Sequence, residues 1–178
     1  MQARKLAVIA LLATLLPGCG GKPADMPVAE QVDLARYAGL WYEIARLPAF
    51  FQRGCYDATA FYSLNDDGTV AVTNRCLRQG ESRRIEGTAT AIDDTQARLK
   101  VQFDRWFTRL LPAGDYWIIH VDADYQRAVV GTPDRDYLWL LARTPEISSS
   151  DYRRMLDIAA GLDFPVDELV VNSDLRPQ

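Results

Sequence analysis

The side chains best suited to covalent or metal chemistry are few in this chain: three cysteines and a single histidine, His120. A thiolate at Cys19, Cys55 or Cys76 would be a nucleophile or a metal ligand, and His120 would be the only imidazole base. One histidine rules out a multi-histidine metal centre, and we expect no metal or other cofactor. No G-x-S-x-G turn presents a serine, and no phosphate-binding glycine loop opens a βαβ unit. The cysteines are therefore better explained by attachment and cross-linking than by catalysis.

Residues 1–18 have the three parts of a secretory signal peptide. Arg4 and Lys5 form the basic start, residues 6–16 form the apolar middle, and the small residue Gly18 precedes the break. The apolar stretch is too short for a membrane span, which needs about 20 apolar residues. We expect this segment to direct export and then to be removed.

Leu16-Pro17-Gly18-Cys19 resembles a bacterial lipobox. The resemblance implies that Cys19 is lipidated and becomes the first residue of the mature protein, held to a membrane by chains that contribute about 0.8 kcal/mol per buried methylene. The alternative is an ordinary cleaved signal that leaves a free thiol. Residues 19–32 would be the lipidated N-terminus and a flexible linker, and residues 33–178 would form one domain.

The charge of the mature chain excludes one class of partner. Without Arg4 and Lys5, the chain has 18 basic and 24 acidic residues, which gives a formal charge of −6. Nucleic-acid binding needs a basic patch, which the sequence does not show. The same excess of acidic residues indicates that the folded body does not adhere electrostatically to an anionic membrane, so the anchor would hold the protein there.

Cys55 and Cys76 are an even pair in an exported chain, which permits a disulfide. They flank a predicted hairpin. If Leu64 faces Thr69 across a four-residue loop, Cys55 lies opposite Arg78, one same-face step from Cys76. A bulge or a shorter loop would bring the two cysteines into direct opposition. We predict the bond, with two buried thiols as the alternative.

Eight short segments rich in aromatic and β-branched residues are separated by turn signals. Sequential strands with short connections predict an all-β fold, an up-and-down antiparallel barrel of eight strands whose closure removes the sheet edges. The predicted strands cover residues 41–47, 56–64, 69–77, 84–92, 97–104, 116–121, 126–131 and 137–143.

One α-helix is predicted after the eighth strand. Residues 148–151 can cap it and Gly161 can end it, while Tyr152, Met155 and Ala159 share one apolar face. We expect that face to pack on the outside of the barrel. A last short strand over residues 169–172 would add to the barrel edge.

Three motifs, in this order, resemble those of the lipocalin family. Gly39 and Trp41 stand as in the G-x-W signature of the first strand, residues 132–137 (TPDRDY) are similar to the motif before the eighth strand, and Arg143 matches the arginine that closes it. With the lipobox, the set resembles bacterial outer-membrane lipocalins. The resemblance implies a protein of the outer membrane, facing the periplasm, that binds fatty acids or lysophospholipids.

Strand counting predicts how one end of the barrel is closed. Trp41 starts the first strand and Arg143 ends the eighth, so both lie at the same end of an up-and-down barrel, on neighbouring strands. The guanidinium can then stack on the indole, a cation–π contact that contributes about 0.5 to 2 kcal/mol. We predict that Gly39, Trp41 and Arg143 close this end.

The other end collects the loops 47–55, 77–83, 104–115 and 131–136. Two of these loops carry apolar residues that turn formation does not require, and together these would form a hydrophobic mouth for an apolar ligand. The alternative is that they form small cores beneath the loops. The residues are Phe50, Phe51, Trp106, Phe107, Leu110 and Leu111.

Side-chain alternation predicts the inner wall. Tyr137 and Trp139 share the parity of Arg143 and should face the lumen, whereas the residues between them should lie under the helix. Glu43 shares the parity of Trp41 and would need a partner inside, most simply in a structural polar network. Tyr116 is assigned inward partly from the resemblance, with a hydroxyl that could meet a lipid head group. The expected lipid-binding residues are Tyr116, Trp139, Tyr137, Phe103, Phe50, Phe51, Trp106 and Phe107.

Three functions from different classes follow. The first is a lipid-anchored carrier or store of a small hydrophobic ligand. The second is an interaction lipoprotein that uses its aromatic rim. The third is a weak enzyme that acts on a bound lipid through Glu43 or His120. Composition alone equally allows a retinoid or a quinone as the ligand, haem held by His120 is a further alternative, and both a monomer and a homodimer are compatible with the sequence.

Overall fold

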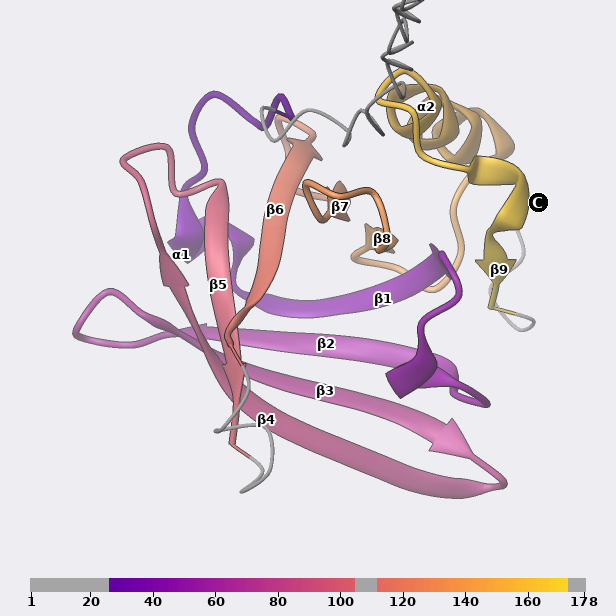
Figure 1. Cartoon of the computed structure of the whole chain (residues 1–178), viewed down its shortest axis with the longest axis horizontal. Coiled ribbons are helices and arrows are strands. Elements are labelled where there is room, and N and C mark those ends of the chain that lie inside the picture. The colour runs from indigo at the N-terminus through magenta and orange to yellow at the C-terminus, as the bar shows by residue number, and fades with distance from the viewer. Residues whose placement is uncertain (1–25, 105–111, 173–178) are drawn as a thin grey trace, which may run out of the picture.

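The computed structural model describes residues 26–104 and 112–172. Eight antiparallel strands follow one another along the chain and curve into a barrel (Figure 1). Their bounds agree closely with the turn signals in the sequence: β1 (Gly39–Arg46), β2 (Tyr56–Leu64), β3 (Val70–Arg78), β4 (Glu81–Ala91), β5 (Arg98–Phe103), β6 (Gly114–Val121), β7 (Arg127–Gly131) and β8 (Leu138–Ala142).

The sheet closes on itself, as predicted. Each strand pairs with the next, β8 pairs with β1, and β1 also pairs with β2. The β1–β2 ladder covers only residues 39–42 of β1, so the later half of β1 would present a free edge. The predicted last strand, β9 (Val170–Val171), pairs there from outside the barrel. Asn172 then joins the diverging strands, since its N–H donates to Ile44 O and its Oδ1 accepts from Asp57 N–H.

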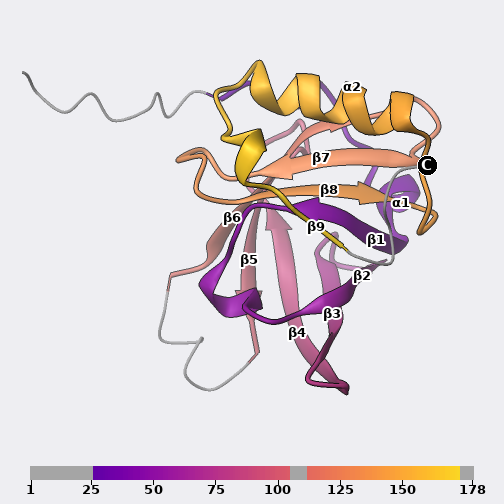
Figure 2. The same cartoon turned by 90° about the vertical axis from the view of Figure 1, so that its right-hand side faces the viewer.

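Helix α2 (Ser149–Ala160) lies across the outside of β7 and β8 (Figure 2). Ser148 caps it by accepting from Asp151 N–H at 3.1 Å. Met155 and Ala159 are buried against the outward side chains of the barrel, so the predicted apolar face is confirmed. A short 3₁₀ turn, η3 (Val166–Glu168), leads from this helix to β9.

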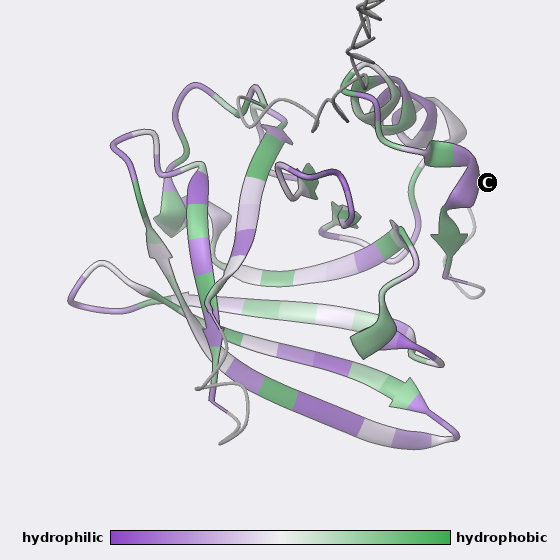
Figure 3. Ribbon diagram, viewed as in Figure 1, coloured by the Kyte–Doolittle hydropathy of each residue, from purple (hydrophilic) through white to green (hydrophobic). Residues whose placement is uncertain are grey.

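Alternation along the strands produces two separate cores. One lies inside the barrel around Trp41, and the other lies between the barrel and α2 around Leu140. Figure 3 shows the corresponding change between hydrophobic and hydrophilic bands along β3 and β4. Strands on the α2 side are apolar on both faces because both faces are covered.

Two features before β1 were not predicted. A one-turn helix, α1 (Leu34–Tyr37), lies at the closed end, with Asp33 as its N-cap. The segment 26–32, predicted to be linker, lies against the barrel: Met26 and Val32 are fully buried. Apolar side chains at these two positions supply burial that offsets the entropy of ordering the segment.

The predicted disulfide is present, with sulfur atoms of Cys55 and Cys76 bonded and Cα atoms 5.5 Å apart. The hairpin loop is one residue longer than predicted, since Leu64 pairs with Val70. A bulge between Tyr56 and Thr59 compensates for the extra residue. The cysteines therefore bond diagonally and fix the loop before β2 to β3.

Arg143 closes one end of the barrel. Its guanidinium carbon lies 3.9 Å from the centre of the Trp41 ring, which confirms the predicted cation–π contact. Its Nη1 and Nη2 donate to backbone carbonyls of residues 36–40, at 2.8 to 3.0 Å, and its Nε donates to Tyr125 O. One side chain thus joins α1, the start of β1, the β6–β7 turn and the end of β8.

Gly39 is required by this arrangement. Its φ of +101° lies in the region that favours glycine, and a Cβ there would stand 3.1 Å from Arg143 Nη1. The indole Nε1 of Trp41 donates to Tyr37 O at 2.8 Å, so the buried indole is satisfied as well.

Replacing Arg143 with lysine should lower the free energy of unfolding by about 2 to 4 kcal/mol, because several carbonyls lose their donor and the indole loses a planar cation. Urea denaturation followed by circular dichroism measures this. Arg75→Lys is a matched control at an exposed site, and its effect should stay below about 0.5 kcal/mol. Equal stability of the two variants would contradict the role of Arg143.

Candidate functional site

The inner wall follows the predicted alternation. Trp139 and Leu141 of β8 belong to the inner core, whereas Leu138 and Leu140 pack beneath α2. At β6, Tyr116 and Ile118 also face inward, and the parity then changes at a bulge between Ile118 and His120. The parity of this strand, open from the sequence, is thereby settled.

Access to the inner wall differs between the two ends of the barrel. At the closed end Trp41 is fully buried and Leu99 is 3% exposed. Nearer the other end, inner-wall side chains remain half-buried, although they lie on the inside of a closed sheet. These are Val101, Tyr116 and Trp139. Phe103 follows Val101 by two residues on β5, so it shares the same parity, and it is half-buried as well. The interior is therefore accessible from the end opposite Arg143, which we call the mouth.

Three tyrosines meet in the interior. The hydroxyl of Tyr116 lies 2.8 Å from that of Tyr37 and 2.9 Å from that of Tyr62. Burial raises the pKa of all three phenols, to about 12 for Tyr62. The three hydroxyls satisfy one another, which allows them to be buried as neutral groups. Tyr116 is thus a satisfied part of the wall as well as a candidate contact for a head group.

Aromatic rings form a continuous column from the closed end to the mouth. Successive centroids are 5.0 to 6.4 Å apart, the usual spacing of interacting aromatic pairs. In order, the column runs Trp41, Tyr37, Tyr62, Tyr116, Trp139, Tyr137, Phe51 and Phe50.

A small polar cluster interrupts this apolar interior. Glu43 and Arg46 form a buried salt bridge of 2.7 Å, and Gln52 Nε2 donates to Glu43 at 2.8 Å. Gln52 Oε1 accepts from Trp139 Nε1 at 2.9 Å. Glu43 therefore has the polar partners it was expected to need. Gln52 belongs to the short helix η1 (Phe50–Gln52) in the loop after β1, so the cluster connects this loop to the inner wall.

The two described phenylalanines of the mouth differ in how far their rings are exposed. Phe51 contacts Tyr137, with ring centroids 5.2 Å apart, whereas Phe50 is 77% exposed and touches Phe51 edge-on. Phe50 is thus not buried in a small core beneath its loop. Trp106 and Phe107, with Leu110 and Leu111, lie outside the described residues.

His120 lies on the outer side of the barrel. It is half-buried, and this burial lowers its pKa, while Asp122 and Arg154 of α2 are the charges that act on it. The parity change at the β6 bulge explains this position. Within the described ranges, no group of three or more His, Cys, Asp and Glu side chains is placed to hold a metal ion, and no helix there is long and apolar enough to cross a membrane.

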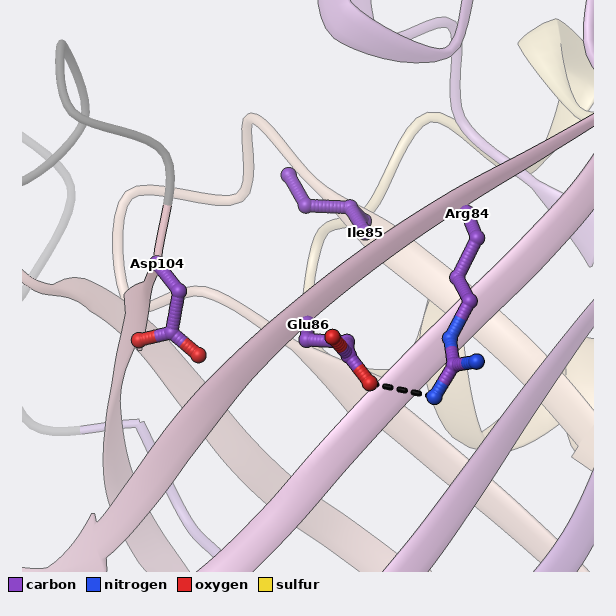
Figure 4. A pocket seen from close by; sticks show the side chains of 4 residues that line it. All are labelled: Arg84, Ile85, Glu86 and Asp104. Atoms are coloured by element: carbon purple, nitrogen blue, oxygen red, sulfur yellow. Dashed lines mark hydrogen bonds and ion pairs between the residues drawn. The ribbon is translucent and has the colours of Figure 1, made fainter.

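An open hollow on the surface is a less suitable ligand site than the interior. Figure 4 shows its lining, in which Arg84 pairs with Glu86, Asp104 stands opposite, and Ile85 is the one apolar side chain. An exposed ion pair and a further carboxylate do not favour an apolar molecule.

Sequence reasoning missed four residues of the interior. Tyr62 shares the parity of Ala58 and Ala60 and could have been found by alternation along β2. Tyr37 comes from a helix of one turn, too short for a periodic signal. Arg46 turns inward after a bulge between Glu43 and Ala45, and Gln52 lies in a loop. Neither of the last two had a sequence signal.

The fold and the inner wall together define the class: a closed β-barrel of the size that holds one small ligand. The chain belongs to the lipocalin family, since the family described as "Lipocalin-like domain" matches residues 32–174.

Relatives and solved structures agree with this assignment. Outer membrane lipoprotein Blc of Citrobacter freundii is 40% identical over 174 residues, 94% of this chain and 96% of that protein. Temperature-induced lipocalin-1 of Arabidopsis thaliana is 37% identical over 161 residues, 86% and 87% of the two chains. Insecticyanin from the tobacco hornworm Manduca sexta has a similar fold, with a TM-score of 0.68 at 17% identity over 84% of each chain.

The tyrosine cluster predicts alkaline unfolding. Because the pKa of Tyr62 is about 12 in the folded protein against about 10 in an unfolded chain, its contribution to stability is complete below pH 10 and is lost as the pH rises from 10 towards 12. Absorbance at 295 nm, recorded with circular dichroism, should show buried phenols ionising late and together with unfolding. Titration of all 8 tyrosines near pH 10 with the fold intact would contradict the cluster.

Proposed function

We propose that this protein is a lipid-anchored lipocalin that carries or stores one small hydrophobic molecule, a fatty acid or a lysophospholipid, in the cell envelope. The observation that carries the proposal is the half-buried apolar wall of the interior, which includes Val101, Tyr116 and Trp139. A ligand that covers this wall gains about 25 cal/mol for each Å² of apolar surface removed from water, which favours a long acyl chain.

The polar cluster suggests where the head group lies. Arg46 is buried, and its Nε–H has no hydrogen-bond partner among the described residues. A carboxylate or phosphate oxygen is a suitable acceptor for that donor. Tyr116 offers less, because its hydroxyl already interacts with two others. We therefore propose that the head group lies near Arg46 and Gln52, with the acyl chain directed towards Tyr116.

The location of the protein is proposed from sequence and relatives. The resemblance of Leu16-Pro17-Gly18-Cys19 to a lipobox supports lipidation at Cys19 after a signal peptide over residues 1–18, and Gly20 lacks the aspartate that favours retention at the inner membrane. Relatives 34 to 40% identical are named outer membrane lipoproteins. We therefore propose the outer membrane, with the barrel facing the periplasm. Residues 26–32 then belong to the folded body, and the linker is correspondingly short.

One alternative has an observation in its favour. The exposed ring of Phe50 would suit an interaction lipoprotein whose rim contacts a protein partner. Haem bound through His120 is not favoured, because this side chain lies outside the barrel beside α2. An enzyme that uses Glu43 would first have to break its salt bridge to Arg46.

Trp139→Arg should weaken binding of a long-chain fatty acid by at least about 100-fold, because the apolar surface of the indole is lost and the acyl chain would have to cover a guanidinium. Val101→Trp should have the same effect by filling the interior. Titration calorimetry of the purified protein, with lysophospholipid as a second ligand, measures both variants. Phe61→Arg is the matched control, since it introduces arginine in place of an aromatic residue that is 50% exposed on the outer wall.

We expect saturable one-to-one binding in the unaltered protein and in the Phe61→Arg variant. We expect no such binding in the Trp139→Arg and Val101→Trp variants. Binding that all three variants retain would place the ligand outside the barrel. Absence of saturation with either ligand in the unaltered protein would favour the interaction lipoprotein instead.

A further inference from the structure

The described chain starts along the wall of the barrel and not at its closed end. Val32 N–H donates to the β4–β5 loop at the closed end, Ala29 N–H donates to Ile118 O half-way along β6, and Met26 is buried beneath α2. Figure 2 shows this segment running from the side where α2 ends to α1 at the opposite side. Cys19 precedes Met26 by seven residues, a reach of at most about 25 Å. A lipid at Cys19 would therefore keep the barrel against the leaflet.

The mouth carries the most exposed aromatic pair of the described chain. Phe50 is 77% exposed and Phe51 is 49% exposed, and both project from η1. Leu64 and Ile92 are exposed at the closed end, but each is followed within three residues by a pair of aspartates. A lipid contact there would remove carboxylates from water at a large cost, whereas a contact at η1 would bury apolar surface.

Charge is distributed unequally between the two ends. The three hairpin loops at the closed end, residues 65–69, 92–97 and 122–126, contain six aspartates and no basic residue. The mouth sector formed by η1 and the β3–β4 hairpin is basic: five arginines accompany two glutamates. The arginines are Arg53, Arg75, Arg78, Arg83 and Arg84, and the glutamates are Glu81 and Glu86. The Cys55–Cys76 disulfide joins the loop that carries η1 to β3 of this hairpin.

Two of these arginines stand directly opposite each other. Arg75 and Arg84 are partners across the β3–β4 ladder, an arrangement of like charges that destabilises a sheet. Glu86 pairs with Arg84, but Arg75 has no ion pair within the described ranges. An external anion would relieve this repulsion. The net charge of −6 is therefore a poor guide to this sector, because six of the aspartates lie in the loops at the other end.

We propose that the mouth docks on the lipid leaflet that holds the anchor, with η1 inserted among anionic lipids and the β3–β4 hairpin against their head groups. The ligand then passes between the leaflet and the barrel without crossing water. The inference rests on the proposed function, because it takes lipidated Cys19 as the tether. Asp134 and Asp136 of the β7–β8 turn would be repelled by anionic lipids, so the docked barrel would tilt with its η1 side towards the leaflet.

The test uses the lipidated full mature chain in vesicles of phosphatidylethanolamine and phosphatidylglycerol. An environment-sensitive dye is attached at Phe50→Cys in one sample, at Asp67→Cys at the closed end in a second, and at Phe61→Cys on the outer wall in a third. The native thiols do not react, since Cys55 and Cys76 are bonded and Cys19 carries lipid.

Docking through the mouth predicts that only the dye at position 50 shifts to shorter wavelength and is quenched by bromine-labelled lipid. A shift at position 67, or no shift at any position, would overturn the proposal. A fatty-acid titration of the same samples tests the proposed function separately. If the barrel binds the fatty acid but the dye at position 50 remains in water, the docking proposal is wrong and the proposed function stands.

Charge reversal provides a second test of the same proposal. Arg53→Glu with Arg78→Glu should increase the accessibility of the position-50 dye to aqueous iodide at least about tenfold, because each basic residue near an anionic leaflet contributes to attraction. Arg153→Glu on the exposed face of α2 is the control and should have little effect. Equal accessibility in the two variants would show that these arginines do not face the leaflet.

Discussion

Arg143 is the side chain on which the rest of the barrel depends. A guanidinium has five N–H donors and a planar face, and here the donors satisfy carbonyls of α1, β1 and the β6–β7 turn while the face covers Trp41. These segments are distant in sequence, and Arg143 contacts all of them. Arg36 adds a second link between α1 and the β6–β7 turn, since its Nη2 donates to Ala123 O at 2.8 Å. At this end of the barrel the inner-wall side chains Trp41 and Leu99 are buried.

The aromatic side chains of the interior extend from the closed end towards the mouth. Tyr37 contacts Trp41 and reaches Tyr116 through its hydroxyl, and the aromatic column continues to Phe51 at the mouth. The tyrosine hydroxyls interact with one another and Glu43 pairs with Arg46, whereas the Nε–H of Arg46 has no partner among the described residues. The wall is therefore buried at its base and more exposed towards the mouth, which suits a ligand with a long apolar body and a polar end.

The sequence predicted most of the fold because the alternation of side chains between the two faces of a strand is a strong signal for strands and their orientation. Trp139 and its neighbours on β8 have the predicted orientation, and the Trp41–Arg143 contact follows from counting strands. Bulges limited the prediction, since a single extra residue reverses every later side chain: Arg46 turned inward and His120 outward for this reason. Bulges depend on how strands pair in three dimensions, and no local residue pattern predicted them.

The most direct test of the account is native mass spectrometry of the protein purified from cell envelopes without added lipid. Binding in the barrel predicts a mass increment equal to one fatty acid or lysophospholipid per chain in the unaltered protein, and none in the Val101→Trp variant. An unliganded mass in every preparation, or an increment that Val101→Trp leaves unchanged, would contradict the assignment of the interior as the binding site.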